Sequence, residues 1–80
     1  MKYVERLPDE QGFVLRCGVG ILAKGDTIEN FVQDIFDNQE SDNIHTGVPH
    51  EDSQQGRFNE KEHTLFWSLY HQKQKEYDRK

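Results

Sequence analysis

The most constraining feature of this 80-residue sequence is the segment 38–57, which carries almost no large apolar side chains. Only Ile44 and Val48 interrupt a run dominated by Asn, Gln, Ser, Asp, His and Gly. Such a segment cannot bury enough apolar surface to offset the conformational entropy that is lost on ordering. A loop of this length in a small domain is generally either disordered or functional. We therefore expect 38–57 to be a mobile loop, and the core to come from the residues on either side of it.

The length of the chain allows one small domain, residues 1–80, with a thin margin of stability. A domain of this size buries only about 60–65% of the surface that its unfolded chain exposes. Hydrophobic residues make up 32% of the sequence, and its one cysteine, Cys17, cannot form an internal disulfide. We therefore expect oligomerisation or a bound partner to supply part of the stability.

Neither a membrane span nor a secretory signal is visible in the sequence. No apolar run approaches the roughly 20 residues that cross a bilayer, and the segment Met1–Arg6 lacks the apolar stretch of a signal peptide. A single unpaired cysteine is consistent with a reducing compartment. We expect a cytoplasmic protein that does not bind membranes.

Two extended segments are expected near the N-terminus. Residues 2–7 alternate weakly between apolar and polar side chains, and Pro8 and Gly12 then supply turn-forming residues. Residues 13–22 alternate with a period of two, which is typical of a strand. The side chains that share one face are Phe13, Leu15, Cys17, Val19 and Ile21. We expect one continuous strand over 13–22, paired with 2–7 in a β-hairpin.

The two faces of this second strand predict different environments. Cys17 belongs to the apolar series, so we expect it to be a buried core residue and not a nucleophile. Gly18 and Gly20 lie together on the opposite face. The absence of side chains there would allow a bulge, or the close approach of a helix or a partner.

A first helix is expected directly after the strand. Asp26 is followed three residues later by Glu29, a pattern in which the two side chains satisfy free backbone donors at a helix start. Apolar residues then recur at helical spacing and form a single stripe. They are Ile28, Phe31, Val32, Ile35 and Phe36. The spacing predicts a helix that begins at Asp26 and carries this stripe into the core.

A second helix is expected from about Glu60, because Asn59 and Glu62 repeat the capping pattern. The residues on its predicted core arc are Leu65, Phe66, Leu69, Tyr70 and Tyr77. A second stripe, at i, i+4 and i+8, consists of His63, Trp67 and His71. Trp67 either packs over the edge of the core or forms, with Tyr70, an interaction surface.

Together these elements predict an α+β fold. Its parts are an N-terminal β-hairpin followed by two α-helices (ββαα), a long polar loop between the helices, and a polar tail at 78–80. In the compact form both helices pack on one face of the hairpin. In the alternative form the last helix extends away and pairs with a second copy of the chain.

Two glycine patterns suggest nucleotide binding but lie in the wrong context. Gly18–Ala23 matches G-x-G-x-x-A, yet in the dinucleotide-binding fold that pattern opens a helix, whereas strand periodicity continues through it here. Gly20 and Gly25 have the spacing of a phosphate-binding loop, but Asp26 stands where a lysine would be needed to reach the phosphates. We expect no nucleotide cofactor.

Four histidines invite a metal interpretation, because neutral imidazole is a common metal ligand. They are His45, His50, His63 and His71. The last two are separated by about 12 Å along a helix and cannot easily share one ion. The first two could gather around a metal with Glu51 and Asp52, but they lie in the expected mobile loop. We expect solvated histidines and no bound metal.

Catalytic chemistry has no complete set of residues in this sequence. Metal-assisted nuclease chemistry could draw on several acids and a histidine, but nothing in the sequence brings them together. These residues are Asp34, Asp37, His50 and Glu51. We expect a protein without enzymatic activity, with a small metal-dependent enzyme that uses the loop histidines as the less favoured alternative.

Acidic residues are concentrated in the middle of the chain. The net charge is −5, but residues 25–56 carry eight Asp and Glu residues and no Lys or Arg. The simpler interpretation is a solvated helix face followed by a soluble loop. The functional interpretation is a negative surface that meets a basic groove on another protein and imitates the charge of a nucleic-acid backbone. This surface would consist of Asp34, Asp37, Glu40 and Asp42, with Asp26 and Glu29 upstream. Direct binding of DNA or RNA is not expected, because these acids would repel the phosphates.

The sequence therefore predicts a small acidic regulatory or inhibitory protein that binds and occludes a site on a larger protein. The target could handle nucleic acid, as for phage and mobile-element accessory proteins that inhibit host defence or transcription; this is an analogy of type. The predicted contact residues are Glu29, Asp34, Asp37, Glu40, Asp42, His63, Trp67, Tyr70 and His71. The main alternative is a structural or assembly module that homodimerises through the last helix.

Overall fold

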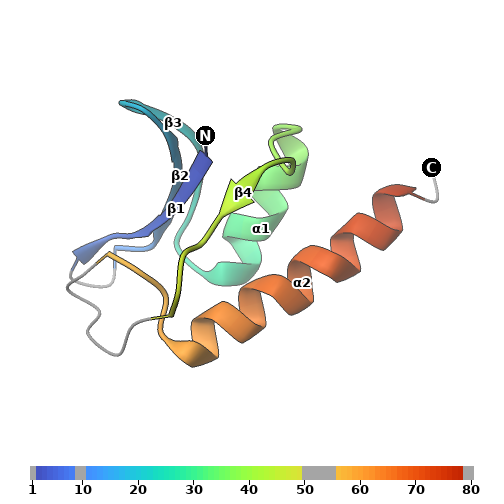
Figure 1. The fold of residues 1–80 in the computed structure, drawn as a ribbon. Helices are drawn as coiled ribbons and strands as arrows, with labels where there is room; N and C mark the ends of the chain where they lie inside the picture. Colours follow the sequence, from blue (N-terminus) through green and yellow to red (C-terminus); the bar gives the residue numbers. More distant parts are fainter. Residues whose placement is uncertain (1, 9–10, 50–55, 79–80) are drawn as a thin grey trace.

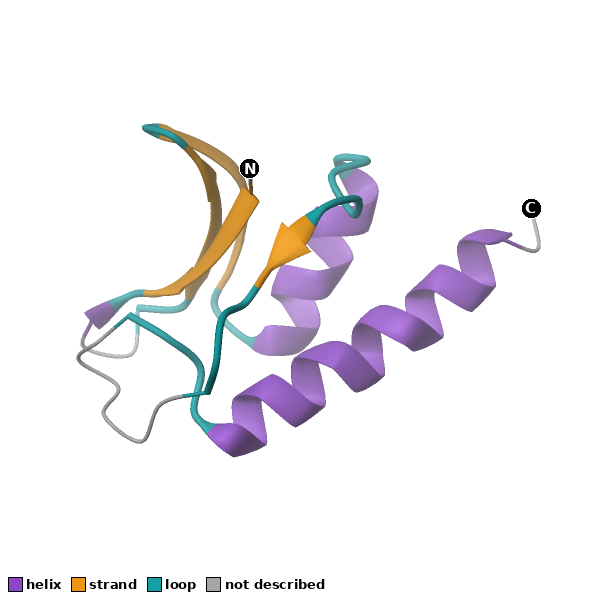
Figure 2. Cartoon of the chain, in the orientation of Figure 1, coloured by secondary structure: helices purple, strands orange, loops and turns teal. Residues whose placement is uncertain are grey.

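The computed structural model describes residues 2–8, 11–49 and 56–78. They form an α+β fold in which a four-stranded mixed sheet packs against two helices (Figure 1, Figure 2). The elements are β1 (Lys2–Arg6), β2 (Phe13–Cys17), β3 (Gly20–Gly25), α1 (Ile28–Asp37), β4 (Ile44–His45) and α2 (Glu60–Asp78). The strand order is β3-β2-β1-β4, in which β1, β2 and β3 are antiparallel neighbours and β4 runs parallel to β1.

The predicted hairpin is confirmed, whereas the predicted continuous strand over 13–22 is wrong. In the hairpin of β1 and β2, Tyr3 lies opposite Arg16. After β2 the chain reverses at a turn in which Gly18 has a φ of 63°, in the left-handed region that glycine tolerates. Alternation with a period of two continues on both sides of this turn, so periodicity alone could not reveal it. The segment predicted as one strand is therefore two strands, β2 and β3.

The tip of the β2–β3 hairpin lies outside the core, which corrects the prediction for Cys17. Cys17 is the last residue of β2 and is exposed. Val19 in the turn is 100% exposed. Figure 1 shows this tip curving away from both helices. The alternating pattern correctly identified strand residues, but burial on one face ends where the helices end.

A short fourth strand lies within the segment predicted to be a loop, so the predicted ββαα order is incomplete. In β4, Ile44 lies opposite Lys2 and its side chain packs against the core. The Nζ atom of Lys2 lies 2.8 Å from Glu40 and 2.7 Å from Asp42, which fastens the approach to β4 against the start of β1. Of the predicted loop and tail, residues 50–55 and 79–80 lie outside the described residues.

The core is built by α1, which packs on the sheet, and by α2, which packs on α1 (Figure 1). The predicted apolar stripe of α1 is confirmed, because all five of its residues are buried. Four phenylalanine rings join the layers in a closed cycle with centroid distances of 5.3–6.0 Å. They are Phe13, Phe31, Phe66 and Phe58. Aromatic pairs at such distances stabilise by about 0.5–1.5 kcal/mol beyond the burial of their area.

The buried face of α2 differs from the predicted arc. Phe66 is fully buried, and Leu69 and Tyr70 pack against the core as predicted. Leu65 is 43% exposed and Tyr77 is 38% exposed, so their assignment to the core was wrong. The helix is turned toward the side of Phe66, where the other three phenylalanine rings lie. No helix in the described part of the chain is long and apolar enough to cross a membrane.

The two helix starts are close to the predicted caps. Thr27, and not Asp26, is the N-cap of α1, because its Oγ1 accepts a hydrogen bond from Asn30 N at 3.1 Å. The second pattern is confirmed as a reciprocal capping box. Asn59 N donates to Glu62 Oε1 at 2.9 Å, and Glu62 N donates to Asn59 Oδ1 at 2.8 Å.

The close approach predicted at Gly18 and Gly20 occurs instead at Gly25, where β3 leads into α1. A Cβ atom on Gly25 would lie 2.3 Å from Phe31 N, whereas one on Gly18 would meet nothing within 4 Å. The glycine at the end of β3 therefore allows the first turn of α1 to lie directly against the sheet.

Candidate functional site

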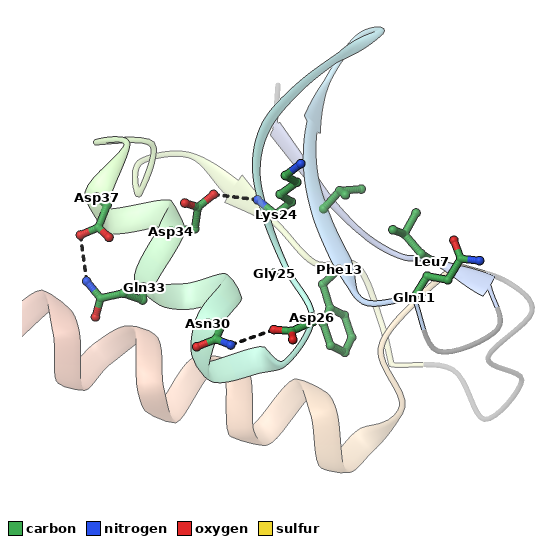
Figure 3. Close-up of a pocket in the computed structure, with 11 residues that line it drawn as sticks. Leu7, Gln11, Phe13, Lys24, Gly25, Asp26, Asn30, Gln33, Asp34 and Asp37 are labelled. Carbon is green, nitrogen blue, oxygen red and sulfur yellow. Dashed lines mark hydrogen bonds between the residues drawn. The ribbon is translucent and has the colours of Figure 1, made fainter.

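The candidate site is an open groove of about 570 Å³ that crosses the end of β3 and one side of α1 (Figure 3). One wall carries the carboxylates of Asp26, Asp34 and Asp37. The other side is apolar and is formed by Leu7, Phe13 and Val14. The side-chain amides of Gln11, Asn30 and Gln33 and the side chain of Lys24 complete the lining. We call this feature the acidic groove.

The carboxylates of the acidic groove are oriented by hydrogen bonds within the chain. Asp34 Oδ2 accepts from the backbone N–H of Lys24 at 2.9 Å, which ties α1 to β3. Asp37 Oδ1 accepts from Gln33 Nε2 at 2.8 Å, one helical turn away. Figure 3 shows the Asp34 bond between α1 and β3, and the bond of Asp37 to Gln33 farther along α1. The carboxylate wall is therefore held in place before any ligand arrives.

Asp26 is held in its charged form at the entrance to α1. Its Oδ1 accepts a hydrogen bond from Asn30 Nδ2 at 2.8 Å. This bond, with backbone N–H groups nearby, lowers the pKa of the Asp26 carboxyl below its ordinary value of 3.8. Asp26 therefore presents a negative charge to the groove throughout the neutral range.

The apolar side of the acidic groove gives it a chemistry that exposed acids alone would lack. Phe13 and Val14 are 8% and 3% exposed, so this side consists of the partly exposed Leu7 and the small exposed parts of two packed side chains. A long aliphatic stem can lie on such a surface while a cationic head reaches carboxylates beside it. Lysine and arginine side chains have this composition. The geometry suits a basic side chain of another protein.

The predicted negative surface is divided into three places. Of the six acids proposed for it, the acidic groove collects Asp26, Asp34 and Asp37. Glu29 instead lines a hollow of about 330 Å³ between α1 and α2. Glu40 and Asp42 lie after α1 and bind Lys2. The hydrogen bond that Lys2 Nζ donates to Asp42 raises the pKa of the Lys2 ammonium above its ordinary value of 10.5. Glu40 and Asp42 are therefore engaged by contacts within the chain.

The predicted aromatic stripe of α2 attaches the helix to the segment around β4. Trp67 Nε1 donates to Thr46 Oγ1 at 3.2 Å, and the hydroxyl of Tyr70 donates to the carbonyl of Ser41. Burial raises the pKa of the Tyr70 phenol above its ordinary value. Both aromatic rings pack against the core. Trp67 therefore packs against the core, and its role with Tyr70 in an interaction surface stays a prediction.

The histidines of the stripe flank the tryptophan. The ring centroids of His63 and His71 lie 6.4 and 5.9 Å from that of Trp67. His63 is partly buried and His71 is exposed. In β4, the ring of His45 lies beside that of Tyr3, with centroids 6.1 Å apart. These three histidines therefore stand next to aromatic rings.

The metal and nuclease hypotheses fall partly on residues that lie outside the described ones. His50, Glu51 and Asp52 belong to this group, so their arrangement with Asp34 or His45 is not tested. Within residues 2–8, 11–49 and 56–78, no group of three or more His, Cys, Asp or Glu side chains could hold a metal ion.

The apolar side of the acidic groove was missed by sequence reasoning. Leu7, Phe13 and Val14 come from β2 and the turn before it, and they meet α1 only because β3 folds back along β2. The one local signal was the junction Gly25-Asp26, because only Asp26 and Thr27 separate the end of β3 from the start of α1.

Comparisons of the chain with protein-family models, with curated proteins and with solved structures find no match. The chemistry of the acidic groove is accordingly inferred from the contacts and charges of this chain.

Proposed function

We propose that this protein is a non-enzymatic binding protein that docks on a larger protein through the acidic groove and occludes a site there. The observation that supports the proposal is the junction of three carboxylates with an apolar surface in one groove. A basic side chain would place its stem over Phe13 and Val14 and its charged head beside Asp26, Asp34 or Asp37. The shape of the groove thus favours a protein partner with protruding lysine or arginine residues.

The charge of the groove also narrows the class of target. Carboxylates repel nucleic-acid phosphates, so a direct complex with DNA or RNA is disfavoured. Proteins that handle nucleic acid carry basic surfaces, and an acidic ligand can occupy such a surface in place of the nucleic acid. We propose that the target is of this kind and that binding is inhibitory or regulatory.

The test neutralises the acidic groove without removing its hydrogen bonds. In Asp26→Asn/Asp37→Asn, the amide oxygens still accept from Asn30 and Gln33, but two charges are lost. The control Glu60→Gln/Glu76→Gln removes the same charge from exposed positions on α2. Asp34 is left unchanged, because it also binds the backbone of β3.

The measurement is capture of proteins from source-cell lysate on each tagged form, at low and at moderate salt. We expect the wild type and the control to retain one stoichiometric partner, and the groove variant to bind it at least about tenfold more weakly, about 1.4 kcal/mol. Higher salt should weaken the wild-type complex. Equal retention by the groove variant, or no partner for the wild type, would contradict the proposal.

A further inference from the structure

The acidic groove also contains a cation. Lys24, on β3, lines the groove together with Asp26, Asp34 and Asp37. Figure 3 shows its side chain rising from β3, whereas the carboxylates of Asp34 and Asp37 extend from α1. The groove therefore offers both signs of charge to a single ligand.

The ammonium of Lys24 is not neutralised from within the described part of the chain. Asp34 Oδ2 accepts at 2.9 Å from the backbone N–H of Lys24, and the same oxygen lies 3.2 Å from Asn38 Nδ2. This carboxylate is thus directed at a backbone group of β3 and at the C-cap of α1. Among residues 2–8, 11–49 and 56–78, no ion pair includes Lys24. Its charge is available to a ligand that carries a carboxylate.

The two signs of charge are close enough to bind one residue of a partner. Only Gly25 separates Lys24 from Asp26, and two residues of extended chain span at most about 7 Å. An extended arginine separates its guanidinium from its own backbone carboxyl group by a comparable length. The groove volume of about 570 Å³ also lies in the range of sites for small ligands, about 300–1,000 Å³. This size suits the end of a peptide chain better than a helix laid across the groove.

We propose that Lys24 determines the specificity of the acidic groove by binding a carboxylate, and that the partner presents a C-terminal arginine or lysine there. The α-carboxylate lies at Lys24, the aliphatic stem lies on the apolar side, and the cationic head lies beside Asp26 or Asp37. A C-terminal basic residue is the favoured ligand because it carries both charges on one residue, whatever the fold of the partner. A contact made only by basic side chains would leave Lys24 facing like charge.

This inference rests on the proposed function, because it takes the acidic groove to be the site that binds a basic side chain. It adds the position of that side chain in the partner, which is the end of the chain. Recognition of the basic head and recognition of the carboxylate can be measured separately.

The test uses four short peptides and three forms of the protein. The peptides are acetyl-Gly-Gly-Arg with a free C-terminus, the same peptide amidated, amidated acetyl-Gly-Gly-Arg-Asp, and acetyl-Gly-Gly-Gln with a free C-terminus. Lys24→Met removes the ammonium but keeps an unbranched stem and the backbone N–H that donates to Asp34. The control Lys61→Met removes the same charge from an exposed position on α2, outside the groove.

The measurement is the affinity of each peptide from NMR titration, followed at the backbone amides of groove residues. We expect the wild type and Lys61→Met to bind the free-acid arginine peptide about two- to fivefold more tightly than its amide, which is the gain typical of an exposed ion pair. Lys24→Met should bind these two peptides equally. The glutamine peptide should bind all three proteins more weakly than the free-acid arginine peptide does.

The outcomes separate this inference from the proposed function. Equal binding of the acid and the amide by the wild type, or a preference for the acid that survives Lys24→Met, would overturn the role of Lys24 but leave the basic side chain recognised. If the amidated Arg-Asp peptide binds as tightly as the free acid, the assignment to a chain end is wrong. If the glutamine peptide binds as tightly as the arginine peptide, or no peptide binds, the inference and the proposed function both fail.

Discussion

The two helices of this domain are held in place in different ways. α1 has 10 residues and buries five of them, whereas α2 has 19 residues and buries only Phe66 completely. α1 lies between the sheet and α2 (Figure 1), so its apolar stripe must fill the space on both sides. α2 covers α1 from outside and keeps most of its surface in water. The layer in which a helix lies thus determines how closely its own pattern of apolar residues matches its burial.

The attachment of α2 depends more on polar contacts than that of α1. Besides Phe66, its contacts with the rest of the fold include the hydrogen bonds of Trp67 and Tyr70 to the segment before and after β4. Glu62 adds an ion pair, because its Oε2 lies 3.3 Å from Arg6 Nε in β1. Such contacts are directional and individually weak, about 0.5–1.5 kcal/mol each for neutral hydrogen bonds. α2 should therefore loosen under conditions that leave α1 packed.

The largest expected effects separate the buried phenylalanines from the exposed leucine of α2. Phe31→Ala in α1 and Phe66→Ala in α2 should each lower the free energy of unfolding by about 3–5 kcal/mol, because both side chains are fully buried in the cycle of rings. Leu65→Ala should cost less than about 1 kcal/mol, because that side chain is 43% exposed. Urea unfolding followed by circular dichroism gives all three values. A cost for Leu65→Ala close to that of Phe66→Ala would show that α2 packs through a different face.

Effects of intermediate size are expected at the helix caps. Thr27→Ala in α1 and Asn59→Ala in α2 each remove a side-chain acceptor from a helix start, a loss of about 0.5–2 kcal/mol. We expect Asn59→Ala to be the more costly of the two. It removes the side-chain oxygen that accepts from Glu62 N in a partly buried bond, whereas the bond to Thr27 is exposed. The backbone N–H of residue 59 is retained and still donates to Glu62 Oε1. The same urea titrations measure these values. A larger cost for Thr27→Ala than for Asn59→Ala would contradict the prediction that the cap of α2 contributes more to stability than the cap of α1.

The sequence allowed α1 to be predicted much better than α2, for a reason that the fold makes clear. The apolar residues of α1 occupy one side of the helix, so a single face could be buried. In α2 the apolar residues spread over a wider arc that includes Leu65, Phe66 and Trp67, and the pattern does not select one face. Phe58, which is 1% exposed, selects it by packing against Phe66, and no periodicity could reveal a contact with a residue in a loop.

The acidic groove, like α2, could be predicted from the sequence only in part. Its carboxylate wall follows from helical spacing, since Asp34 and Asp37 are three residues apart on α1. Its apolar side required the turn at Gly18, which the alternating pattern concealed. Glu40 and Asp42 looked equivalent to the groove acids in the sequence, but Lys2, 40 residues from Asp42, binds them in the structure. Side chains that are equivalent in sequence were separated by tertiary contacts.

The smallest expected effect uses alkaline pH to loosen α2 without changing its sequence. Burial raises the pKa of Tyr70 above its unfolded value of 10.0, so the folded protein keeps the phenol proton at a pH where the unfolded chain releases it. The stability associated with the neutral phenol is therefore complete below pH 10.0 and is lost as the pH rises above it. Lys2 acts in the same direction, because its raised pKa stabilises the folded state below 10.5 and that contribution is lost as the pH rises through the folded pKa.

The measurement is the urea midpoint of the wild type and of Tyr70→Phe, at neutral pH and above pH 10.0. At neutral pH we expect Tyr70→Phe to be less stable by about 1 kcal/mol, because the carbonyl of Ser41 loses its donor. Between the two pH values, the midpoint of the variant should fall less than that of the wild type, and the remaining fall is assigned to Lys2. Because the Tyr70 hydroxyl joins α2 to Ser41, the ring signals of Phe66 and Trp67 should change before those of Phe13 and Phe31. An equal fall in both proteins would mean that the attachment of α2 does not depend on the Tyr70 phenol, and the contrast between the two helices would then rest on packing alone.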